Sequence, residues 1–149
     1  MTPFDPEKHA QWEADRGRIK ARKASSRQIP MQAILEQLQS PHLLRSWLQT
    51  KQPNEIVGAA QTPDETVLAN FLWETLGICV IAFGVELWPL DRDPLELPTW
   101  CGEFATVEGE HSRAGDAARG NWTAVQALAM LDETEVRIER REPNNQARE

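Results

Sequence analysis

The chain has few cysteines and no long apolar run, and each shortage excludes a class of protein. Two cysteines in 149 residues are too few for a disulfide scaffold or a four-cysteine zinc site. No apolar stretch approaches the roughly 18–20 residues that cross a membrane, and the N-terminus carries no apolar signal core. We therefore expect a cytoplasmic protein that does not bind membranes.

Several sequence motifs of common enzymes are also missing. The chain contains no Walker loop, no G-x-G-x-x-G, no G-x-S-x-G and no H-E-x-x-H. These patterns position phosphates, dinucleotides, a serine nucleophile or a catalytic zinc. We accordingly expect no cofactor and no bound metal.

Charge is distributed unevenly along the chain. The formal net charge is −7, but residues 1–30 carry +3 and residues 31–111 carry −9. The acidic balance argues against a general nucleic-acid coat, which needs excess lysine and arginine to bind phosphates. We predict a basic N-terminal arm over 1–29, a globular domain over 30–138 and a disordered charged tail over 139–149.

The hydrophobic pattern predicts a small α+β domain of about five helices with two or three short strands. Pro30 and the Ser40-Pro41 pair favour the starts of two helices, which would form either a hairpin or one helix kinked near Pro41. The sequence Thr62-Pro63-Asp64-Glu65 is a capping box that would start a third helix, which Gly77 would end.

The remaining elements are read from strand-forming runs and prolines. Glu55–Gly58 is expected to be a short strand or an extended connector. Ile78–Val85, which is apolar on both faces, is expected to be a central strand. Prolines should exclude regular structure from Pro89 to Pro98, with only a short segment at Thr99–Phe104. A second capping box at Thr123–Gln126 would start a helix over 124–131. Val136 and Ile138 then suit an edge strand or an extension of that helix.

The basic arm carries the first candidate binding residues. At 100° per residue, five of its side chains fall within about 80° on one helical face: Trp12, Arg16, Lys20, Lys23 and Arg27. Such a stripe can lie along phosphates or in an acidic protein groove. Alternatively, the arm is a solvated leader that rests on its own acidic domain.

The second set of candidates follows from the aromatic content, since the chain has six tryptophans and no tyrosine. Trp88 and Trp100 bracket a proline-rich acidic segment that contains Asp91 and Asp93. Tryptophan is enriched among the residues that dominate binding energy at protein interfaces. Pro94 interrupts the pattern that a calcium loop would need, so we interpret this segment as a protein-binding surface.

A third reading is a small enzyme centred on Cys101, His111 and Asp116. Glu108 and Glu110 would share the same glycine-containing loop. None of these residues matches a known metal-ligand or nucleophile spacing. Cys79 fits a small core residue.

Our leading hypothesis is a non-enzymatic interaction or regulatory module, such as an accessory subunit or an immunity-type inhibitor. It would bind a protein partner through the acidic tryptophan-bearing segment and the basic arm. The alternatives are a nucleic-acid-binding accessory protein that uses the arm, and the small enzyme.

Overall fold

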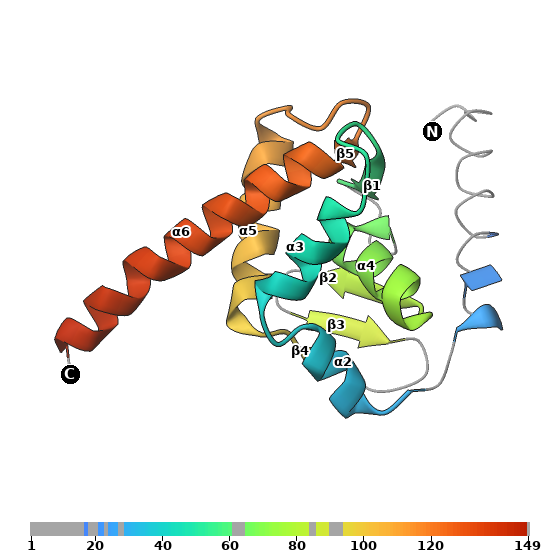
Figure 1. The fold of residues 1–149 in the computed structure, drawn as a ribbon, viewed down its shortest axis with the longest axis horizontal. Coiled ribbons are helices and arrows are strands. Elements are labelled where there is room, and N and C mark those ends of the chain that lie inside the picture. Colours follow the sequence, from blue (N-terminus) through green and yellow to red (C-terminus); the bar gives the residue numbers. More distant parts are fainter. Residues whose placement is uncertain are drawn as a thin grey trace, which may run out of the picture.

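The computed structural model describes positions 17, 21–22, 24–26, 29–60, 65–83, 86–89 and 94–148, the last eight by their backbone only. Within these residues, five helices and five short strands form a single α+β domain, as the sequence predicts. Figure 1 shows that α6 (Ala124–Arg148) is the longest element and extends past the rest of the domain at the C-terminal end.

The first two helices follow the proline signals. The helix α2 (Met31–Gln37) begins immediately after Pro30, and α3 (Pro41–Gln49) has Ser40 as its N-cap residue. The apolar stripe of α3 places Leu44, Trp47 and Leu48 in the core. The two helix starts that the prolines predict are confirmed, and a short turn over 38–40 separates the helices.

The helix α4 (Val67–Leu76) begins later than expected. Its cap is Thr66, whose Oγ1 accepts a hydrogen bond from the Ala69 N–H at 3.2 Å, whereas Thr62 lies outside the described residues. Gly77 ends the helix in the left-handed region at φ 70°, where a residue without Cβ is favoured.

The strands form two small antiparallel sheets, and the predicted central strand at Ile78–Val85 is not central in either. In one sheet β1 (Ile56–Ala59) pairs with β5 (Asn121–Thr123). In the other, β2 (Val80–Phe83), β3 (Glu86–Pro89) and β4 (Leu95–Glu96) lie in the order β2-β3-β4. The apolar run after Gly77 therefore supplies an edge strand, because the chain reverses after Phe83 and pairs with β3.

The proline-rich segment also contains regular structure. Pro89 stands at the end of β3, where it faces Val80, and Leu95 pairs with Leu87 just beyond Pro94. Proline lacks an N–H donor and is tolerated at such strand ends. The exclusion of regular structure from Pro89 to Pro98 is thus wrong.

The helix α5 (Thr99–Arg113) is far longer than the short segment expected there. Its buried side chains follow helical spacing at Trp100, Phe104 and Val107, and burial of this face outweighs the low helix propensity of its two glycines. Its C-terminal half, which we expected to be a loop, carries Glu108, Glu110 and His111.

The second capping box is confirmed and starts α6. Thr123 Oγ1 accepts from the Gln126 N–H at 3.3 Å, while Gln126 Oε1 accepts from the Thr123 N–H at 3.0 Å. Val136 and Ile138 extend the helix, so the edge-strand alternative is wrong. The helical backbone also includes residues 139–148 of the predicted disordered tail, and it continues through Pro143, for which the structure gives no compensating contact among the described side chains.

The core lies where α3, α4, α5 and α6 meet the two sheets. Its largest fully buried side chains come from each of these helices and from α2, β3 and β5: Trp122, Phe71, Phe104, Ile34, Leu38, Leu44, Leu48, Leu72, Leu87 and Leu131. In the part of the chain that the structure describes, no helix is long and apolar enough to cross a membrane.

Candidate functional site

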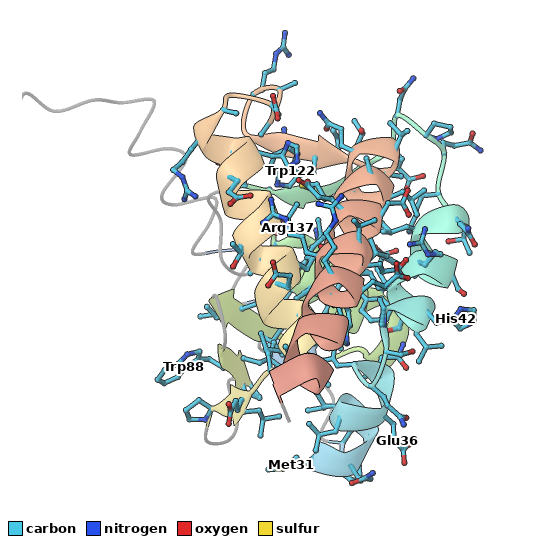
Figure 2. The ribbon with its side chains drawn as sticks, turned by 90° about the vertical axis from the view of Figure 1, so that its left-hand side faces the viewer. Met31, Glu36, His42, Trp88, Trp122 and Arg137 are labelled. Carbon is cyan, nitrogen blue, oxygen red and sulfur yellow. The ribbon has the colours of Figure 1, made fainter. Side chains whose placement is uncertain are left out.

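Trp88 is the sequence-predicted binding residue that the structure exposes. It lies on β3 between Leu87 and Pro89, which both point into the domain, and it is 44% exposed. Side chains alternate across a strand, so Trp88 stands on the outer face of the sheet beside Ile81, its partner in register. Figure 2 shows Trp88 projecting away from the domain.

Trp100 corrects the second half of that prediction. It is 6% exposed, and its indole N–H donates to the Leu38 carbonyl at 2.7 Å, which ties α5 to the end of α2. Trp100 is therefore a core residue and has no free face for a partner. Asp91 and Asp93 lie outside the described residues.

The predicted basic stripe cannot be placed. All five of its members, Trp12, Arg16, Lys20, Lys23 and Arg27, lie outside the described residues. The described part of the arm instead places Arg22 against the domain. Its Nη1 donates to Asn70 Oδ1 at 3.1 Å, and its guanidinium carbon lies 5.2 Å from the centre of the Trp73 ring.

The small-enzyme alternative required Cys101 and His111 to act together, and the structure separates them. Cys101 is fully buried on α5, and burial raises the pKa of its thiol, which disfavours the reactive thiolate. His111 is ten residues later on the same helix, roughly 15 Å along the axis. A Cys–His nucleophile pair is therefore excluded.

His111 belongs to a groove of about 460 Å³ between α5, the turn after it and α6. Its Nδ1 lies 2.6 Å from Asp116 Oδ2, and its Nε2 lies 2.8 Å from Glu133 Oε2. The hydrogen bonds to Asp116 and Glu133 raise the pKa of His111, because both carboxylates favour the charged ring. Sequence reasoning did find Asp116 beside His111.

The geometry of His111 is that of a cross-link. Both ring nitrogens face carboxylate oxygens, and a carboxylate can only accept, so the ring donates from both and carries the second proton. An imidazolium has no lone pair with which to accept a substrate proton. This arrangement favours a structural role for His111 over a general base.

Arg137 extends the polar contacts along the same groove. From α6 it reaches Glu110 on α5, and it pairs with Glu133 at 3.1 Å and with buried Glu103 at 3.7 Å. Figure 2 shows Arg137 between the two helices. The hydrogen bond from Arg137 lowers the pKa of Glu110, while the bond from His111 lowers that of Glu133. No motif in the sequence reveals these pairs, which join residues far apart in the chain.

Glu108 on α5 is a further titratable group with a shifted pKa. Its side chain is largely withdrawn from water, and this burial raises its pKa to about 7 although the Trp122 indole donates to it at 3.2 Å. The carboxyl lies at the junction of α5 and β5, where the protonated form is favoured more than in water. Among the residues that the structure describes, no group of three or more His, Cys, Asp or Glu side chains could hold a metal ion.

Comparisons of the chain with protein-family models, with curated proteins and with solved structures found no match.

Proposed function

We propose that this chain is a non-enzymatic protein-binding module, of the accessory-subunit or inhibitor kind, whose contact surface centres on Trp88. The observation that carries the proposal is the exposure of this indole on a paired strand. Of the tryptophans in the described residues, Trp47, Trp100 and Trp122 are buried and Trp73 is half-buried. Trp88 alone among them offers a large apolar surface to a partner.

The surroundings of Trp88 favour a partner with a basic surface. Glu96 on β4 is exposed and stands opposite Glu86 of β3 in the sheet register. In sequence, residues 86–96 contain four acids and one base. An exposed apolar residue in a sequence segment rich in acids can supply both buried area and electrostatic complementarity to a basic partner.

The groove around His111 supports the non-enzymatic part of the proposal. The charged groups of His111, Asp116 and Glu133 pair with one another. The Cys101 thiol is buried elsewhere on α5. We keep the cytoplasm as the proposed location. Nucleic acid is the alternative partner, and no contact of the described residues favours it.

Affinity capture with matched variants tests the proposal. The full chain, Trp88→Ala and Val136→Ala would each be tagged and expressed in the native host. Val136 on α6 is exposed to the same degree, 43%, and so controls for the loss of any exposed apolar group. Crosslinking from position 88 should identify one captured protein as the partner. The affinity of that purified partner for Trp88→Ala should be roughly 30-fold lower than for the wild type, which is the effect of an interface residue worth about 2 kcal/mol.

Equal affinity of the purified partner for Trp88→Ala and the wild type would contradict the proposal. Tight binding of labelled DNA or RNA at about 0.15 M salt would favour the nucleic-acid alternative, because an acidic chain should bind phosphate weakly there.

A further inference from the structure

A second feature of the surface is an open cleft of about 400 Å³ that lies between α4, β1 and the arm. Its walls include the Trp73 ring, the Asn70 amide and the carboxylate-bearing residues Glu65 and Glu74. It lies away from β3 and shares no residue with the Trp88 surface described above.

The Asn70 amide is fixed so that an acceptor faces the cleft. Its Nδ2 donates to the Val57 carbonyl at 2.9 Å and to the Glu65 carbonyl at 3.2 Å. These bonds use both amide protons, which determines the orientation of the side chain. Oδ1 is therefore left to receive a donor from the cleft side.

The arm supplies that donor. Arg22 Nη1 donates to Asn70 Oδ1 at 3.1 Å while the guanidinium lies over the Trp73 ring at 5.2 Å. A planar guanidinium can stack on an indole and donate from its edge at the same time, whereas the ammonium of lysine is a compact point charge. The combination of ring face and fixed acceptor is thus selective for arginine.

A second contact holds the arm in place. The Ser26 hydroxyl accepts a hydrogen bond from the Cys79 N–H at 2.9 Å, next to the start of β2. Arg22 and Ser26 are one helical turn apart. Arg22 is half-buried in this position and is not part of the hydrophobic core.

We propose that the α4 cleft is an arginine-binding site, filled in the free chain by Arg22, and that an arginine-bearing segment of a protein partner takes the same position when the arm moves away. Glu65 and Glu74 also line the site, and Glu74 pairs with Lys51. The arm then competes as an intramolecular ligand, at an effective concentration on the order of millimolar. This inference needs no contact at Trp88, so the two proposals fail separately.

A labelled synthetic peptide tests the site without any native partner. The probe is a copy of residues 16–30, and its charge-matched control has every arginine replaced by lysine. Fluorescence anisotropy would measure binding to the full wild-type chain and to Arg22→Ala, with circular dichroism confirming that both are folded. We expect the arginine peptide to bind Arg22→Ala roughly tenfold more tightly than the wild type.

Further variants of the chain identify the contacts that bind the peptide. The lysine peptide should show little preference for Arg22→Ala, and adding Trp73→Leu to that variant should remove the gain. Arg22→Lys should open the cleft almost as fully as Arg22→Ala. Equal binding of the two peptides, or an Arg22→Lys chain that excludes the peptide as the wild type does, would overturn the assignment to a guanidinium.

Sedimentation tests which copy of the arm fills the cleft. A wild-type monomer supports the intramolecular contact. A wild-type dimer that Arg22→Ala dissociates would place the arm of a second copy in the cleft and overturn the proposed self-occupancy.

Discussion

Replacement of Glu108 by glutamine should stabilise the protein at alkaline pH. The carboxyl lies at the junction of α5 and β5, and burial raises its pKa from 4.5 to about 7. Ionising it in the folded state therefore costs free energy that the unfolded chain does not pay. Glutamine cannot ionise, and its Oε1 can still accept the hydrogen bond from Trp122.

The size and the pH window follow from the two pKa values. Between pH 4.5 and about 7 the folded state holds a proton that the unfolded state has released, so the free energy of unfolding falls as pH rises. A pKa difference of this size corresponds to about 3 kcal/mol at full ionisation. Glu108→Gln should match the wild type near pH 4 and exceed its stability by up to about 3 kcal/mol near pH 8.

Urea denaturation followed by tryptophan fluorescence at a series of pH values measures this difference. Other titrating groups are common to both chains and cancel in the comparison. Glu96→Gln makes the same chemical change at an exposed position and controls for net charge. A difference between Glu108→Gln and the wild type that stays constant from about pH 4 to about pH 8 would refute the reasoning.

Three further predictions concern packing and the groove. Phe71 is fully buried, so Phe71→Ala should lower the free energy of unfolding by roughly 3–5 kcal/mol in chemical denaturation, and a melting temperature equal to that of the wild type would contradict this. Gly58→Ala should destabilise by roughly 1–3 kcal/mol, because an added Cβ would lie 2.7 Å from a side-chain carbon of α4 and 2.8 Å from a backbone nitrogen there. The control Gly109→Ala, whose Cβ would meet only the end of an arginine at 3.4 Å, should raise stability by about 0.5–1 kcal/mol in the same assay. The ring protons of His111 should titrate in NMR with a midpoint above the usual pKa of 6.5, and Asp116→Asn should lower that midpoint. The stability that protonated His111 contributes is complete below pH 6.5 and is lost as pH rises through the raised pKa.

The sequence predicted the elements whose starts and stops are local. Proline signals mark the beginnings of α2 and α3, Gly77 ends α4, and the reciprocal bonds of Thr123 and Gln126 start α6. Each of these signals acts within about one turn of backbone. Such features can be read without knowing what packs against them.

Only the start of α5 was predicted from the sequence, because local and tertiary preferences disagree over its C-terminal half. Gly102 and Gly109 lower helix propensity, yet Phe104, Val107 and His111 recur at three- and four-residue spacing on one face. Giving this periodicity more weight would have placed His111 beside the core. Its partner Glu133 lies on another helix, and no local pattern predicts that pairing.

The net charge of a segment does not show which of its charged side chains face a partner. The acidity of residues 31–111 suggested an exposed negative face, but buried Glu103 and exposed Glu110 from this region both pair with Arg137 of α6. Part of the negative charge is therefore neutralised within the domain. A long-range pairing of this kind changes what a partner meets while leaving the composition unchanged.

The alternation of side chains along a strand decides which tryptophan is exposed and so available to bind a partner. Leu87, Trp88 and Pro89 are all apolar, so hydrophobicity alone cannot say which of them faces water. Once Leu87 is committed to the core, the two-residue repeat of a strand sends Pro89 inward and Trp88 outward. Trp100 stands at the start of a helix whose buried face includes it, and its N–H finds a carbonyl there. The tryptophans that bracket the acidic segment thus differ because one belongs to a strand and the other to a helix, which is why the proposed binding surface rests on Trp88.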